Sequence, residues 1–242
     1  MKGYGQYCPI SKAAEILSER WTLLVLRELL VGGRRYNDLR RGIPLISPTV
    51  LTERLKTLQK AGVVEHKVGS NSKVGEYLVT PAGQELWPLL EQMGVWGQRW
   101  VKSKLGREDL DASFLMWDIH RNLRFDRLPR RNIVVYVEFS DGKKGARNYW
   151  LVIDETAVDL CIDDPGHEID LQVMTDVRTL TRIWMGDLSL SSARSTGLIK
   201  LFGDGALIRS MGAWLGKSHF ADVKAATYSN PGVSRSRPAM QH

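Results

Sequence analysis

The chain of 242 residues is 43% hydrophobic and 25% charged, which is ordinary for a globular protein and excludes fibrous and largely disordered classes. No apolar run approaches the roughly 20 residues that a membrane-spanning helix needs, and the N-terminus lacks the apolar core of a signal peptide, so we expect a cytoplasmic protein. The net charge of +7 is uneven, because residues 1–107 hold 17 Lys and Arg against 9 Asp and Glu, whereas residues 108–242 hold 17 against 18.

A basic first half joined to a near-neutral second half is typical of a polyanion-binding unit attached to a unit with another task. The alternative is a basic surface that serves only solubility. We expect two domains, residues 1–107 and 108–227, followed by a disordered tail at 228–242 that lacks apolar periodicity. The two cysteines are too few for a disulfide framework and suit a reducing compartment.

Three helices are predicted in the first 42 residues. Apolar residues recur at intervals of three and four after Pro9, which favours a first helix there. The run from Trp21 to Val31 is apolar nearly all round and is closed by two glycines, so it predicts a buried central helix. A third, shorter helix is predicted from Arg35 to Arg41.

A fourth helix is predicted to begin at Pro48, because Ser47 can cap it and proline suits a first helical turn. Its leucines share one face, and Gly62 ends it. The opposite face is polar and consists of Thr49, Thr52, Glu53, Lys56 and Lys60. Two helices joined by a short Gly-containing turn, the second with such a face, are typical of a helix-turn-helix.

Strands predicted at 63–68 and 76–80 flank a polar tip and form a hairpin, which directly after a recognition helix is a wing. Thr80 and Pro81 then predict the start of a helix that continues to Trp100. Its wide apolar stripe is more than a small domain easily covers, so we expect a partner subunit to cover it. The alternative is that the second half of the same chain covers it.

The first half resembles the HxlR-type winged-helix transcription regulators. The resemblance covers about residues 7 to 100 and depends on an ordered set of motifs: Cys8-Pro9, Trp21 to Leu29, Tyr36 to Leu39, Ile46 to Pro48 with Leu51 to Leu55, Ala61 to Val64, and Glu76-Tyr77 to Thr80 with Gly83. It implies a homodimeric protein that binds double-stranded DNA, with the helix from Pro48 to Ala61 in the major groove and the wing near the minor groove.

DNA binding needs cations for phosphates and short polar side chains for base edges. Thr49, Thr52 and Lys56 are our candidates for contacts at or near bases. Many relatives carry a basic residue at the position of Thr49, so specificity here is expected to depend more on DNA shape. Phosphate contacts are expected from Ser47 with the helix N-terminus and from five cations: Arg34, Arg35, Arg40, Arg41 and Lys73.

The second half is predicted to contain a helix at 113–125, strands at 133–139, 148–153, 157–162 and 169–174, and a helix at 176–185. Its motifs resemble a sterol carrier protein domain over about residues 113 to 215, which implies strands and helices around an apolar tunnel for lipid-like molecules. These motifs are Tyr149 to Leu151, Asp170 to Val173 with Leu180, Trp184 to Leu188, and Gly197 to Asp204. The whole chain is therefore expected to be α+β.

We expect a small apolar ligand to contact aromatic residues of this second domain: Trp117, Phe139, Trp150, Trp184 and Phe202. The alternative for each of them is ordinary core packing. The histidines and cysteines lack metal-ligand spacing, and no nucleophile elbow, phosphate-binding loop or paired-carboxylate pattern is present, so neither catalysis nor a cofactor nor a metal is expected.

The interpretation is a homodimeric regulator whose operator binding is controlled by an apolar small ligand. One alternative is a lipid carrier with a basic docking domain. Another is a redox-switched repressor, because several members of the family sense oxidants at this Cys-Pro position, and a place before a helix N-terminus lowers the pKa of Cys8. We favour a structural role for Cys8, since no second cysteine lies near it in sequence.

Overall fold

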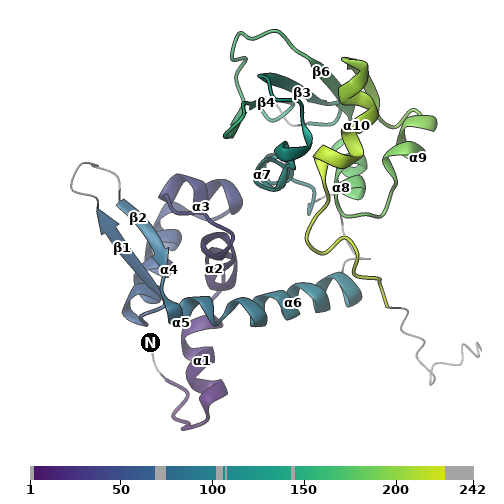
Figure 1. Cartoon of the computed structure of the whole chain (residues 1–242). Coiled ribbons are helices and arrows are strands. Elements are labelled where there is room, and N and C mark those ends of the chain that lie inside the picture. The colour runs from purple at the N-terminus through teal and green to yellow at the C-terminus, as the bar shows by residue number, and fades with distance from the viewer. Residues whose placement is uncertain (1–2, 69–74, 102–105, 107, 143–144, 227–242) are drawn as a thin grey trace, which may run out of the picture.

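The computed structural model describes residues 3–68, 75–101, 106, 108–142 and 145–226. The fold is α+β: an N-terminal winged helix-turn-helix unit is joined by a long helix, α6, to a C-terminal unit built on a five-stranded mixed sheet (Figure 1). Among the described residues, no helix has the length and apolar character needed to cross a bilayer.

The N-terminal unit begins with four helices, α1 (Pro9–Leu17), α2 (Thr22–Leu30), α3 (Tyr36–Gly42) and α4 (Pro48–Lys60). Their core forms where Leu51, Leu55 and Leu58 of α4 pack with the apolar side chains of α2, and all three leucines are buried. Ser47 caps α4 by accepting a hydrogen bond from the Val50 amide at 3.3 Å. The cap and the leucine stripe were predicted from the sequence, and both are confirmed.

The wing follows α4 directly. Strand β1 (Val64–Val68) pairs antiparallel with β2 (Gly75–Val79), and the predicted tip between them lies outside the described residues. The single helix predicted from Pro81 to Trp100 is wrong, because the structure has α5 (Pro81–Gln84) and then α6 (Trp87–Trp100). Pro88 explains the break: it lacks an amide hydrogen and its ring obstructs the preceding turn, so it suits only the start of a new helix.

The C-terminal unit contains α7 (Ala112–Asn122), the 3-10 helix η2 (Phe125–Arg127), β3 (Ile133–Phe139), β4 (Asn148–Ile153), β5 (Val158–Cys161), β6 (Leu171–Thr175), α8 (Val177–Trp184), α9 (Leu190–Ser195), β7 (Lys200–Gly203) and α10 (Gly205–Leu215). The strand order is β5-β4-β3-β6-β7, with β3 and β6 parallel and the other neighbours antiparallel. The core lies between this sheet and α7, α8 and α10.

Contacts of α7 with α3, and of the segment after α10 with α6, help to hold the units together besides the α6 connection. Helix α7 lies against α3, where the guanidinium of Arg41 is 5.5 Å from the ring centroid of Trp117. The segment after α10 returns along α6, where Phe220 lies against Gly94 and the amide of Ala226 donates to the carbonyl of Arg99 at 2.9 Å. Figure 1 shows this segment passing the end of α6.

Candidate nucleic-acid interface

The outward face of α4 is the centre of the candidate interface. Ser47, Thr49 and Lys56 are exposed on it, opposite the buried leucines. Thr52 is half-buried, and its hydroxyl donates to the carbonyl of Pro48 at 2.9 Å. This bond uses the hydroxyl hydrogen, so Thr52 is left to act toward a base as an acceptor or through its methyl group.

A side chain of α3 fixes the position of the start of α4. The hydroxyl of Tyr36 donates to the same Pro48 carbonyl at 2.9 Å. A helix N-terminus with an exposed serine cap offers backbone N–H groups and a positive dipole end to a phosphate. The arrangement therefore presents phosphate-binding and base-contacting groups on one exposed turn.

The predicted phosphate-binding cations separate into three groups. Arg34, Arg35 and Arg40 are exposed around α3, and Arg35 lies 4.0 Å from Glu76 of the wing. Arg41 is directed to the C-terminal unit, because its guanidinium lies over Trp117. Lys73 lies outside the described residues.

Arg54 does not belong to the exposed face. Its side chain donates to the carbonyl of Arg20 at 3.0 Å and pairs with Glu19 at 3.1 Å, which ties α4 to the connection between α1 and α2. Glu53, its neighbour in sequence, is exposed beside Lys56. A carboxylate at this place disfavours close approach of phosphate and can accept from a cytosine amino group.

Cys8 stands at the N-cap of α1 and is partly exposed. The backbone N–H groups of Ser11 and Ile10 lower the pKa of the Cys8 thiol below its ordinary value, because they stabilise the thiolate. Cys161 lies on strand β5, and both cysteines are free thiols.

The five predicted ligand residues do not surround one cavity. Phe139 is buried in the core, Trp150 packs beside Tyr136, and Phe202 is 52% exposed on β7. Trp117 faces the N-terminal unit. The cavity lined by core residues of the sheet and of α7, α8 and α10 has a volume of about 10 Å³, room for about one water molecule, so it does not form the expected tunnel.

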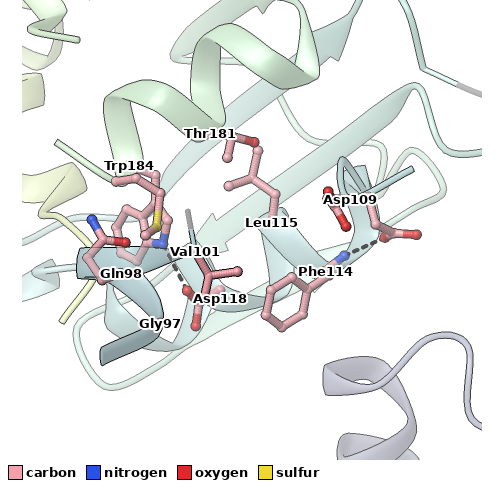
Figure 2. Close-up of a pocket in the computed structure, with 11 residues that line it drawn as sticks. Gly97, Gln98, Val101, Asp109, Phe114, Leu115, Asp118, Thr181 and Trp184 are labelled. Carbon is pink, nitrogen blue, oxygen red and sulfur yellow. Dashed lines mark hydrogen bonds between the residues drawn. The ribbon is translucent and has the colours of Figure 1, made fainter. Parts of the chain in front are cut away.

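Trp184 instead lines a pocket of about 440 Å³ between helices α6, α7 and α8, which we call the α6–α7–α8 pocket. Figure 2 shows the side chains of Phe114 and Leu115 from α7 and of Trp184 from α8 around it, with Val101 from the end of α6. The indole N–H of Trp184 donates to Asp118 at 2.8 Å, which fixes that wall.

One buried ionic cluster was not anticipated from the sequence. Glu28 of α2 is 1% exposed, and its carboxylate pairs with Arg27 at 2.7 Å and with Arg121 of α7 at 2.6 Å. The indole N–H of Trp117 also donates to it at 3.4 Å. The charged pair Arg27 and Glu28 inside the largely apolar run from Trp21 to Val31 was a visible signal, but the second partner of Glu28 lies 93 residues further along the chain.

The comparisons with known proteins concern the N-terminal unit. The model of the HxlR-like helix-turn-helix family matches residues 16–105. The uncharacterized HTH-type transcriptional regulator YvaP of Bacillus subtilis is 38% identical over 98 residues, which is 40% of this chain and 91% of YvaP. A regulator of the same description from Synechocystis, sll1512, is 35% identical over 101 residues, or 41% of this chain and 75% of its own length.

A third relative is the HTH-type transcriptional regulator YodB of Bacillus subtilis, which is 32% identical over 97 residues, or 39% of this chain and 87% of YodB. The family match ends before α7, so it leaves the five-stranded unit unassigned. The winged helix-turn-helix geometry and the similarity over nearly the whole of YvaP agree, and the chain belongs to the HxlR-like helix-turn-helix family.

Proposed function

We propose that this protein is a homodimeric transcription regulator that binds a pseudo-palindromic DNA operator through α4 and the wing of each subunit. The observation that carries the proposal is the polar outward face of α4, where Ser47, Thr49 and Lys56 are exposed opposite a buried leucine stripe. The excess of Lys and Arg in residues 1–107 supports it, because phosphate contacts supply most of the sequence-independent affinity for DNA.

The homodimer is supported by apolar side chains that the chain leaves uncovered. Leu89, Met93, Trp96 and Trp100 recur at helical spacing along α6, and each is exposed, Trp96 by 61%. The segment after α10 packs on α6 at Gly94 and does not cover them. A second copy would bury this stripe. The two recognition helices of the dimer must then lie about 34 to 36 Å apart to enter successive major grooves on one side of the duplex.

Control by a small effector is the finer part of the proposal. The α6–α7–α8 pocket supports it, because it lies where the helix-turn-helix unit meets the C-terminal unit and contains Trp184, one of the expected ligand residues. A ligand in this pocket changes operator affinity only if it binds the DNA-binding conformation and the non-binding conformation with different affinities. The size of the change is set by that difference.

The test is an electrophoretic mobility-shift titration of the full chain with the DNA that flanks its own coding region. We expect Lys56→Ala to weaken binding about tenfold or more, the effect of losing one DNA contact. Lys200→Ala removes the same charge from β7 in the C-terminal unit and should leave binding unchanged. Equal affinities of Lys56→Ala and the unmodified protein would contradict the assignment of α4.

A second candidate, a redox-switched repressor, is favoured by one observation, the lowered pKa of the partly exposed Cys8 thiol. Oxidation of this thiol would then alter DNA binding directly. Cys8→Ser separates the two mechanisms: it should abolish any response of the mobility shift to peroxide if Cys8 is the sensor, and it should leave a response to a ligand intact.

A further inference from the structure

The α6–α7–α8 pocket has the size and walls of a small-molecule site. Its volume of about 440 Å³ lies within the range of roughly 300 to 1,000 Å³ that is usual for organic ligands. Phe114, Leu115, Val101, Trp184 and Met185 form apolar walls, and the backbone of Gly97 leaves α6 open toward them. An apolar ligand therefore fits.

The charged side chains that line the pocket, among the described residues, are all acidic. Asp109, Asp111 and Asp118 line it, and no Lys, Arg or His is among the described residues that do. Asp118 is neutralised by Arg121 at 2.7 Å. Asp111 accepts a hydrogen bond from the Phe114 amide at 2.8 Å and Asp109 accepts one from the Gly106 amide at 2.7 Å, and these amides carry no full charge.

Two carboxylates at the edge of an apolar cavity favour a cation and disfavour an anion, because the apolar walls raise the strength of charge interactions. The ring of Trp184 adds cation–π attraction for a diffuse positive charge. A small inorganic cation gains little from apolar walls, whereas an organic cation gains from both features.

Helix α7 connects the pocket with the helix-turn-helix unit. Arg121 donates through Nε and Nη2 to Asp118, which lines the pocket, and through Nη1 to Glu28 of α2. The Arg27 guanidinium carbon lies 5.1 Å from the ring centroid of Phe114, another lining residue, and Arg27 donates to the carbonyl of Gly42 at the end of α3 at 2.9 Å. Both of these connections between the pocket and the helix-turn-helix pass through an arginine.

We propose that the α6–α7–α8 pocket binds an apolar organic cation, such as a phosphonium ion or a protonated lipophilic amine, and that this ligand is the effector. Asp109 and Asp111 bind the positive charge of the ligand, and the apolar groups of the ligand pack against Phe114 and against the wall formed by Trp184 and Asp118. Displacement of these side chains alters the Arg27 and Arg121 contacts with α2 and α3. The effector role depends on the DNA-binding function proposed above, whereas the binding site does not.

The binding experiment is isothermal titration calorimetry of the full chain with tetraphenylphosphonium and, separately, with tetraphenylborate, which has nearly the same shape and the opposite charge. We expect the cation to bind at least tenfold more tightly than the anion. Equal affinities would overturn the assignment of ligand class, and no binding of the cation would overturn the site.

The variant for this experiment is Asp109→Asn with Asp111→Asn, since asparagine also caps a helix and so retains the start of α7. It should weaken cation binding about tenfold or more. The matched control is Asp163→Asn with Asp164→Asn, which removes two charges from an exposed loop and should change nothing. If the first variant fails to fold, Thr181→Phe, which fills the pocket from α8, should abolish binding instead. Unchanged cation affinity in either pocket variant would overturn the site.

The effector role is tested by repeating the mobility shift with tetraphenylphosphonium. The cation should change the operator affinity of the unmodified protein at least fivefold and that of the pocket variant much less. Cation binding without a change in the mobility shift would overturn the effector role. If the protein binds the cation but no operator DNA, the proposed function fails, and the effector role with it, while the binding site stands.

Discussion

At the scale of single residues, the buried carboxylate of Glu28 restricts which residues can occupy the positions around it. A buried carboxylate is costly unless its partners are all in place, and here Arg27, Arg121 and Trp117 supply them. The carboxylate occupies the space where a side chain of Gly42 would lie, so a Cβ there would overlap it. Glycine at position 42 is therefore required by packing.

Gly42→Ala should reduce the free energy of unfolding by about 1 to 3 kcal/mol, the usual cost of forcing atoms into a filled space. Gly212→Ala is the matched control, because position 212 lies inside α10 and a Cβ there meets nothing within 4 Å. Alanine is the better helix former, so this control should gain up to about 1 kcal/mol. Urea denaturation measures both, and an equal effect of the two substitutions would contradict the packing argument.

His120 makes stability depend on pH. Burial lowers its pKa below the ordinary value, and Arg41 and Arg121 act in the same direction, against the opposing effects of the Val158 carbonyl and Asp159. Nε2 lies 2.7 Å from that carbonyl, whereas the buried Nδ1 has no hydrogen-bond partner among the described residues. The folded protein therefore favours neutral His120, and the unfolded chain binds the proton more tightly.

The free energy of unfolding should accordingly fall as the pH drops below about 6.5, the ordinary histidine pKa, and level off below the pKa of folded His120. His120→Gln retains a donor for the Val158 carbonyl and removes the titration. The stability difference between the two proteins should be smaller at pH 5.5 than at pH 7.5 in urea denaturation. A difference that does not vary with pH would contradict this assignment.

At the scale of elements, helices and strands with strong local sequence signals were predicted correctly, and those with weak or conflicting signals were missed. Helix α4 was recognised because Ser47, Pro48 and Gly62 mark its ends, and β3 and β4 because they are long and rich in β-branched and aromatic residues. The break between α5 and α6 was missed, although Pro88 marks it, because the apolar stripe continues across it. Helix α10 was not predicted, although Asp204 caps it by accepting hydrogen bonds from the amides of Ala206 and Leu207.

Helix α6 carries the prediction that belongs to this scale. Trp96→Glu places a charge in the exposed apolar stripe and should convert the proposed dimer to a monomer, because burying an unpaired carboxylate costs several kcal/mol. Gln84→Glu, at the exposed end of α5, adds the same charge away from the stripe and should leave the dimer intact. Size-exclusion chromatography with light scattering gives the molar mass, and a dimeric Trp96→Glu variant would exclude this face as the interface.

At the scale of the whole molecule, the sequence predicted the two units but not the way they meet. The basic first half, the recognition helix and the wing follow from local patterns. The direction of Arg41 and the partner of Glu28 depend on where α7 lies in space, which no local pattern records. The pocket was missed for the same reason, because its walls come from α6, α7 and α8 together.

The unequal charge of the two halves gives a prediction for the complete protein. Operator affinity should fall steeply with salt, and Arg40→Ala should reduce the slope of log affinity against log salt concentration by about 1, the effect of losing one phosphate contact. Lys200→Ala should leave the slope unchanged, because it lies on β7. Fluorescence anisotropy at several salt concentrations measures this, and an unaltered slope for Arg40→Ala would remove Arg40 from the interface.

The return of the chain from α10 to α6 has a calorimetric consequence. The hydrogen bond between Ala226 and Arg99 brings together the two ends of the chain segment that contains the five-stranded unit. The ion pair of Arg121 with Glu28 connects that segment to α2. Melting either unit alone would expose the returning segment and leave the Glu28 carboxylate without Arg121. Differential scanning calorimetry should therefore record one heat-absorption peak, because the two units unfold together. Two well-separated peaks would mean that the contacts between the units are too weak to couple their unfolding.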